Sequence, residues 1–315
     1  MLPKDVHAST ELLAQAAVRR AWVQWSAIGA TTLHAPKPEQ EIVDIEALLL
    51  GSLGLAARVP RLRTLATDWT LENSRLLSIA RLRALLTGPF AQTGVNLEEL
   101  AERALFDAGD ARWRALLPNG PSHDRARRRS DKAVRKAMPP RWRGAQTLML
   151  QLRRGFGIGV KPDVLAILLG SGDSWLDVST LAELSGYTVS AIRLAADDMA
   201  SAALVESSGS HGRAYRADLK AWTLLFPKVG APSWRRRADG FSLVLRWLAK
   251  TRQTDGLHHS AFDLALAFAA LMDQYDALKR EAGITREPSS DDLAQVWPSR
   301  HESILALVQW FGGTE

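Results

Sequence analysis

The chain has 315 residues, of which 46% are hydrophobic and 23% are charged, and its formal net charge is +6. This length allows two or three domains with separate cores, and the composition is typical of a folded globular protein. Cysteine is absent, which excludes a disulfide framework, a thiolate zinc site and a cysteine nucleophile. The longest apolar stretch, 261–272, is too short to span a bilayer, and the first residues lack the apolar core of a secretory signal. We therefore expect a cytoplasmic protein with no membrane partner.

Residues 1–120 are predicted to form a helical domain, because apolar residues recur there at three- and four-residue spacing. Prolines and capping residues divide this pattern into separate helices. The predicted helices cover 11–28, 39–57, 61–69, 73–86 and 97–108. Trp69 and Trp113 are expected in the core between them.

A basic connector is predicted at 121–155. Between Asp124 and Arg154, 11 Lys or Arg face two Asp, so this segment carries +9 and the rest of the chain carries −3. Basic side chains suit contact with phosphates. Each neutralised phosphate steepens the slope of log binding constant against log salt concentration by roughly 0.9. The candidate DNA-contacting residues of the connector are Arg125, Arg127, Arg128, Arg129, Lys132, Arg135 and Lys136. A solvated face and docking on an acidic partner remain open as alternatives for this charge run.

Residues 156–227 carry the most specific pattern of the chain. An apolar helix at 162–169 is followed by a turn and then by two helices with a sharp turn between them. Asp177 and Thr188 are placed to cap the second and third helices. Gly186 supplies the left-handed residue that the sharp turn between these helices requires.

Two short strands are predicted after the third helix. The first begins at 204–205, a hairpin tip follows at 209–212, and the chain returns at 214–217. A closing helix is expected at 220–226, with Trp222 packed against the preceding elements.

The pattern over residues 161–226 resembles the winged helix-turn-helix modules of bacterial transcriptional regulators, in the broad style of the MarR and ArsR families. The resemblance implies a third helix in the major groove and a hairpin wing along the phosphate backbone. Two residues depart from the pattern, since Ser185 replaces a buried aliphatic residue and Ala203 replaces a helix-ending glycine. The candidate DNA-contacting residues of this module are Thr188, Ser190, Arg193, His211, Arg213 and Arg216. Arg193 is the strongest candidate for reading a base, because a guanidinium can bond two acceptors on a guanine edge.

Residues 228–315 are predicted to form a C-terminal helical domain, with helices at 240–250, 261–280 and 304–311. No motif of the chain predicts catalysis, a cofactor or a metal site. The glycines of 155–159 lack the Gly-Lys-Ser/Thr ending of a nucleotide loop and suit a hinge. His258 and His259 have no second carboxylate–histidine cluster nearby in the sequence, so we do not expect an enzyme.

The sequence therefore predicts a mainly α fold, with a winged helix-turn-helix between two helical domains. The resemblance implies a sequence-specific regulator of double-stranded DNA that represses by occluding a promoter, and many such regulators bind as homodimers. The alternative is an antitoxin or phage-defence operon component whose winged helix and helical domains bind a protein partner. Residues 161–226 contain five Lys or Arg against eight Asp or Glu, which favours the alternative, whereas the connector favours DNA.

Overall fold

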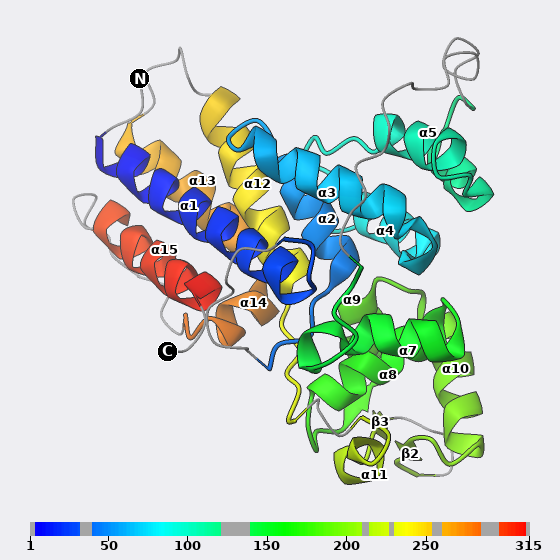
Figure 1. The fold of residues 1–315 in the computed structure, drawn as a ribbon. Helices are drawn as coiled ribbons and strands as arrows, with labels where there is room; N and C mark the ends of the chain where they lie inside the picture. The colour runs from blue at the N-terminus through cyan, green and yellow to red at the C-terminus, as the bar shows by residue number, and fades with distance from the viewer. Residues whose placement is uncertain are drawn as a thin grey trace.

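The computed structural model describes residues 4–31, 40–120, 139–209, 214–226, 230–253, 260–284 and 296–312. The chain is mainly helical and carries one small three-stranded antiparallel sheet (Figure 1), which confirms the predicted fold class at this level. No helix in these ranges combines the length and the apolar character needed to cross a membrane.

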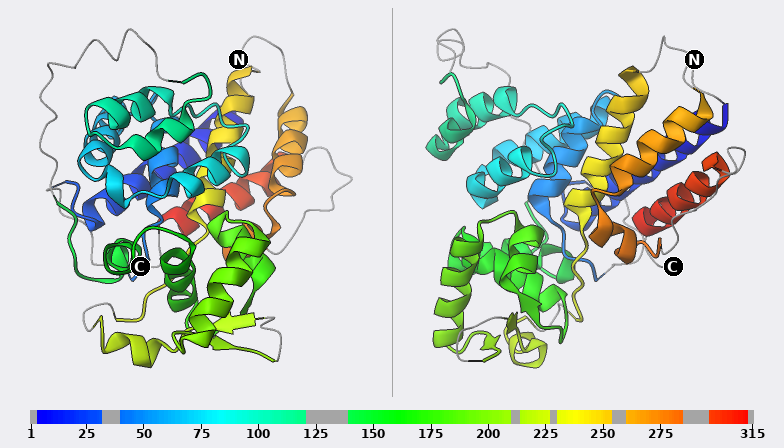
Figure 2. Two further views of the ribbon diagram at one scale, coloured as in Figure 1. Left: turned by 90° about the vertical axis from the view of Figure 1, so that its right-hand side faces the viewer. Right: turned by 180° about the vertical axis from the view of Figure 1, so that it is seen from behind.

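Two segments from opposite ends of the chain pack together into what we call the helical body. The first contributes α1 (Lys4–Ala27), α2 (Ile45–Gly54), α3 (Pro60–Glu72), η1 (Ser74–Leu76), α4 (Ile79–Thr87), α5 (Glu98–Phe106) and η2 (Ala111–Leu116). The second contributes α12 (Arg237–Gln253), α13 (Ala261–Met272), α14 (Asp276–Glu281) and α15 (Val296–Gly312). Helix α1 lies along α15, and α12 lies against α2, so both segments share one core (Figure 2). The division of the chain into domains remains a prediction.

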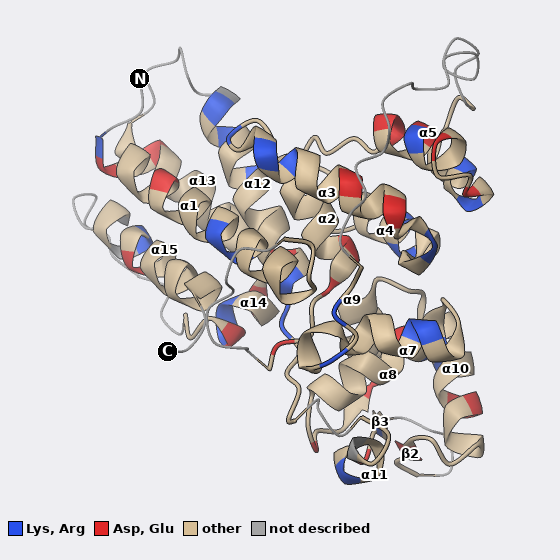
Figure 3. Cartoon of the chain, viewed as in Figure 1, with Lys and Arg blue, Asp and Glu red and all other residues tan. Residues whose placement is uncertain are grey.

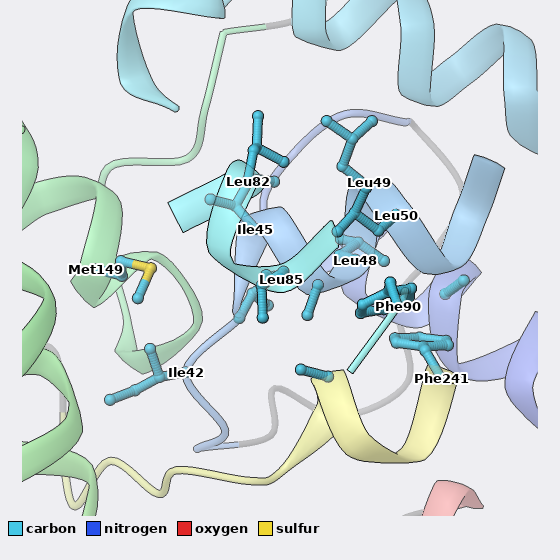
Figure 4. Close-up of a cluster of buried hydrophobic side chains, with 14 of the residues drawn as sticks. Ile42, Ile45, Leu48, Leu49, Leu50, Leu82, Leu85, Phe90, Met149 and Phe241 are labelled. Carbon is cyan, nitrogen blue, oxygen red and sulfur yellow. The ribbon is translucent and has the colours of Figure 1, made fainter. Parts of the chain in front are cut away.

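Helices α2 and α12 approach each other closely because two glycines of α2 face α12. A Cβ atom on Gly51 would lie 2.6 Å from the Cγ atom of Phe241, and one on Gly54 would lie 2.3 Å from a Leu245 methyl carbon. The leucines of α2 continue this apolar surface toward Phe90 and α4 (Figure 4). The centre of the helical body therefore depends on small residues at these two positions.

The chain between the two segments of the body forms what we call the sheet-bearing region, residues 148–226. After η3 (Ala145–Thr147), its elements are α7 (Leu148–Phe156), α8 (Val160–Gly170), β1 (Leu176–Asp177), α9 (Val178–Ser185), α10 (Val189–Ser201), β2 (Glu206–Ser207), β3 (Ala214–Arg216) and α11 (Leu219–Thr223). The sheet has the order β1-β3-β2, with Leu176 opposite Tyr215 and Glu206 opposite Arg216. Figure 1 shows this region below the helical body, with α10 at its edge.

The predicted turn and caps around α9 and α10 are confirmed. A carboxylate oxygen of Asp177 accepts from the backbone N–H of Thr180 at 2.7 Å, and the hydroxyl of Thr188 accepts from that of Ala191 at 3.3 Å. Gly186 ends α9 with a φ of +77°. Trp222 is 6% exposed and donates its indole N–H to the Leu204 carbonyl at 3.0 Å, as expected of a packed closing helix.

Three predicted helices were wrong in extent. The predicted helix at 39–57 starts only at α2, because Asp44 is extended and caps it through the backbone N–H of Ala47. The helix predicted at 73–86 divides into η1 and α4, since Leu77 is extended and Ser78 caps α4. The helix predicted at 261–280 likewise divides into α13 and α14.

The two departures from the expected module are both accommodated. Ser185 is fully buried, and its hydroxyl accepts from the backbone N–H of Tyr187 at 3.3 Å, while the neighbouring Leu184 packs partly against the core. Ala203 is exposed and has a φ of +55°, the one positive value at a non-glycine residue in the described chain. This left-handed conformation disfavours residues with a Cβ atom, so Ala203 holds local strain.

Candidate nucleic-acid interface and its support

Helix α10 exposes one face to solvent. Ile192, Ala196 and Met199 are buried against the rest of the sheet-bearing region at four- and three-residue spacing, as predicted. The opposite face is exposed and contains the three residues predicted on this helix, Thr188, Ser190 and Arg193, together with Val189, Leu194, Asp197 and Asp198. The predicted contact residues of α10 are therefore brought together on one surface.

Arg193 is exposed on this face, and no described residue forms a hydrogen bond or an ion pair with it. Its charge acts on the Tyr215 hydroxyl, where it partly opposes burial and the Asp197 hydrogen bond, which together raise the pKa of Tyr215 to about 12. A guanidinium without an intramolecular partner keeps its donors for an external acceptor. Arg193 is thus the best-placed cation on α10.

The two acidic residues of α10, which is partly red in Figure 3, already have partners. Asp197 accepts from the hydroxyl of Tyr215 at 2.5 Å, and Asp198 forms an ion pair with Lys161 of α8 at 2.9 Å. The Lys161 pair is half-exposed, so it offsets the charge of Asp198 only in part. These contacts hold both carboxylates at the carboxyl half of the helix, away from Thr188 and Ser190.

The sheet contributes one described candidate, Arg216. It forms an ion pair with Glu206 at 2.5 Å, and its guanidinium lies 4.8 Å from the ring centroid of Trp175. Contact with a phosphate would have to compete with both interactions. His211 and Arg213 lie outside the described residues, as do all seven candidates of the connector, Arg125, Arg127, Arg128, Arg129, Lys132, Arg135 and Lys136.

The sheet-bearing region is attached to the helical body through a buried guanidinium on α7. Arg153 is 2% exposed and makes two bidentate pairs, one with Glu46 of α2 at 2.6 and 2.9 Å and one with Asp163 of α8 at 2.7 and 2.8 Å. It also donates to the Leu76 carbonyl at 3.0 Å. Burial opposes the charged form, but the two carboxylates outweigh it and raise the pKa of Arg153 well above its usual value.

A second buried guanidinium, Arg81 of α4, continues the network. It forms a 2.5 Å ion pair with Asp44 and lies 3.8 Å from Glu46. Three carboxylates thus share two guanidinium groups, which leaves a formal excess of one negative charge in a buried site. Burial raises the pKa of Asp44 despite the nearby charge of Arg81. We call the whole set the buried junction; its members are Asp44, Glu46, Ser78, Arg81, Arg153, Asp163 and Tyr187.

Tyr187 joins this junction to the start of α10. Its hydroxyl donates to an Asp163 oxygen at 2.8 Å and lies 2.8 Å from the Ser78 hydroxyl of the helical body. Burial and the charge of Asp163 raise the pKa of Tyr187 above its usual value, so the hydroxyl stays protonated. Since Tyr187 directly precedes the cap residue Thr188, the junction fixes where α10 begins relative to the body.

A second attachment lies at α9 and α12. Arg236 forms an ion pair with Glu183 of α9 at 2.9 Å and another with Asp239 at 3.3 Å. Burial raises the pKa of Asp239 to about 6, although the charge of Arg236 and its hydrogen bond to the carboxylate act in the opposite direction. The backbone N–H of Trp234 also donates to the Gly170 carbonyl at 2.7 Å. The orientation of α9 and α10 is therefore fixed at two separate places.

Sequence reasoning missed the buried junction. A signal was present, because Glu46 and Asp163 each lie in the first turn of a strongly apolar helix, and an unpaired charge is costly where such a helix is buried. Their shared partner Arg153 is 107 residues from Glu46, and no spacing rule connects such distant positions. Among the residues that the structure describes, no group of three or more His, Asp or Glu could hold a metal ion.

Comparison of the chain with protein-family models, with curated proteins and with solved structures finds no match.

Proposed function

We propose that the sheet-bearing region is a winged helix-turn-helix and that the protein is a sequence-specific regulator of transcription that binds double-stranded DNA through α10. The observation that carries the proposal is the capped α9–Gly186–α10 arrangement, whose exposed face gathers Thr188, Ser190 and Arg193. The order of α8, β1, α9, α10, β2 and β3 also follows that of such modules.

In this proposal the amino-terminal half of α10 enters the major groove. Arg193 reads a guanine edge with two donors, and Ser190 contacts a base or a phosphate. The module at 161–226 has a net negative charge and therefore attracts DNA poorly. The cations of the connector supply the non-specific attraction to the phosphates instead. Repression follows from steric occlusion of the promoter and requires no chemical step.

The test is fluorescence anisotropy with a duplex from the region upstream of the gene and a scrambled duplex of equal length, measured over a salt series. Binding to the upstream duplex about a hundredfold or more tighter than to the control supports the proposal. Equal binding to both duplexes, with a steep salt slope, would reject sequence-specific recognition and leave only phosphate contact.

The variant Arg193→Ala is expected to reduce the preference for the upstream duplex by about 1–3 kcal/mol, because it removes a base contact. The matched control is Arg252→Ala, which removes an exposed arginine at the far end of α12 and leaves the preference unchanged. Neutralising Arg127, Arg128 and Arg129 together should instead weaken binding to all duplexes similarly and reduce the salt slope. Equal losses of specificity from Arg193→Ala and Arg252→Ala would contradict the assignment.

A second candidate function is the binding of a protein partner, as in an antitoxin or a phage-defence operon component. The observation that favours it is apolar exposure on the same face of α10, where Leu194 is 68% and Val189 is 46% exposed. Absence of duplex binding even at low salt, with the chain folded, would reject the DNA proposal and favour this one. A homodimer stays a prediction that light scattering of the purified chain can test.

A further inference from the structure

A cavity of about 740 Å³ opens between the helical body and the sheet-bearing region. Its walls come from the end of α3 and η1 on one side, and from the end of α7 with the following Gly157 and Ile158 on the other. The segment that enters η3, including Trp142, forms a third wall. This volume is within the range of small-molecule sites, which often lie where two parts of a protein meet.

Two cations of the cavity have no ion-pair partner in the part of the chain that the structure describes. Arg75 of η1 and Arg154 of α7 are exposed and form no ion pair with any residue of the described ranges. The third arginine of the lining, Arg153, forms ion pairs with Glu46 and Asp163 in the buried junction. The free guanidinium groups therefore favour a ligand with a phosphate or a carboxylate, the groups that arginine binds with two parallel hydrogen bonds.

The acidic lining opposes an anion only weakly. Asp107 is occupied by Arg103 of α5, with 3.4 Å between the Arg103 Nε and a carboxylate oxygen. Glu72 at the end of α3 is exposed and faces solvent as well as the cavity. Its charge opposes the binding of an anion, and water screens this repulsion because the carboxylate is exposed.

Trp142 gives the cavity a flat aromatic surface. Trp142 is 40% exposed, although tryptophan usually buries most of its large surface, and it lines the cavity together with Pro139 and Ile158. An exposed indole in a cavity that two arginines also line is a suitable platform for stacking a planar ring.

We propose that this cavity binds a small anionic ligand with a planar heteroaromatic ring, of the mononucleotide class. The ring stacks on Trp142, and the phosphate lies between Arg75 and Arg154. Binding would bridge the two parts of the molecule next to Arg153. The proposal concerns this cavity alone and does not depend on the function proposed for α10.

Titration calorimetry of the full chain, without DNA, tests it with four probes: adenosine 5′-monophosphate, guanosine 5′-monophosphate, adenosine and inorganic phosphate. We expect saturable binding of at least one mononucleotide, about tenfold or more tighter than that of adenosine or phosphate, because only the nucleotide uses both halves of the site. A short 5′-phosphorylated single strand serves as a fifth probe. Binding of this strand without binding of either mononucleotide would overturn the proposal of a free small ligand, as would no binding of any probe at millimolar concentration.

Variants locate the site. Arg75→Ala and Arg154→Ala should each weaken nucleotide binding about tenfold, Trp142→Ala should weaken it similarly, and Trp142→Phe should retain most of it. Glu72→Gln should strengthen binding severalfold, because it removes a repulsive charge. The control Arg61→Ala removes an exposed arginine at the opposite end of α3 and should change nothing. Unchanged affinity in the Arg75, Arg154 and Trp142 variants, all confirmed as folded by urea unfolding, would place the nucleotide elsewhere and overturn the assignment.

Discussion

Arg153 in the buried junction and Arg193 on α10 have the same side chain but differ in burial and in hydrogen-bond partners. Arg153 is 2% exposed, and its donors are satisfied by two carboxylates and a carbonyl. Arg193 is exposed, with no ion pair in the described chain. The first arginine can only hold parts of the protein together, whereas the second is available to another molecule. Position in the fold, and not residue type, assigns the role.

The buried junction is costly to assemble and more costly to break. Desolvation of its charges offsets much of the attraction between them, so the intact network contributes little net stability. Removal of one partner leaves the others buried and uncompensated. The exposed face of α10 has no such constraint, because water solvates a charge that loses its partner. The predictions below test this difference.

The largest effect is expected from Arg153→Met. The change leaves Glu46 and Asp163 without their shared cation in a buried site, and we expect a loss of about 3–5 kcal/mol in the free energy of unfolding. Urea unfolding followed by circular dichroism measures it. The control Arg154→Met, at the next and exposed position, should lose less than about 0.5 kcal/mol. Equal losses in the two variants would show that the junction does not hold the two parts together.

The second effect concerns Asp239 at the other attachment, where the pKa of about 6 is above the usual 3.8. A carboxyl with a raised pKa binds its proton more readily in the folded state, so stability falls as the pH rises from about 4 to 6. Asp239→Asn cannot ionise, and its Oδ1 can still accept from Arg236. The variant should therefore gain on the order of 2 kcal/mol relative to the native chain over that interval.

Urea unfolding of both chains at pH 4, 5, 6 and 7 measures this gain. Asp276→Asn provides a control of opposite sign, because Lys279 lowers the pKa of this exposed carboxyl through a side-chain hydrogen bond. Stability from Asp276 is lost as the pH falls, so its variant should lose stability relative to the native chain at the higher pH values. A stability difference for Asp239→Asn that does not change with pH would contradict the assigned pKa.

The sequence predicts the elements around α10 better than the parts that hold them. The caps at Asp177 and Thr188 and the turn at Gly186 depend on neighbours within a few residues, and all three were predicted. The division of the helix predicted at 73–86 was missed although the Ser78 cap of α4 is local, and the contact of Ser78 with Tyr187, 109 residues away, was missed as well. Long-range pairing of this kind has no local pattern in the sequence.

A smaller effect is expected from Tyr187→Phe, which removes a hydroxyl from the buried junction. The hydroxyl bonds to buried Asp163 and lies against Ser78, so its loss should cost about 1–2 kcal/mol in unfolding free energy. The matched variant is Tyr215→Phe, whose lost hydroxyl bonds to the exposed Asp197 of α10. Water can replace that bond, and we expect at most about half the loss. A greater loss of stability in Tyr215→Phe than in Tyr187→Phe would contradict the prediction that the buried junction is more sensitive than α10 to the loss of one hydroxyl.

The smallest effect is expected at Ala203, just after the end of α10, and it is a gain in stability. Ala203 has a φ of +55° and is exposed, so Ala203→Gly removes a Cβ atom from a strained conformation without opening a cavity. The relief of about 1 kcal/mol is partly offset by the greater freedom of glycine in the unfolded chain, which leaves a net gain of about 0.5 kcal/mol. Ala202→Gly, at the neighbouring exposed residue with a φ of −86°, has no strain to relieve and should lose stability. Thermal unfolding of both variants should show a higher melting temperature for Ala203→Gly and a lower one for Ala202→Gly. A loss in both variants would show that the conformational entropy that glycine loses on folding outweighs the strain at Ala203, and it would contradict the predicted gain.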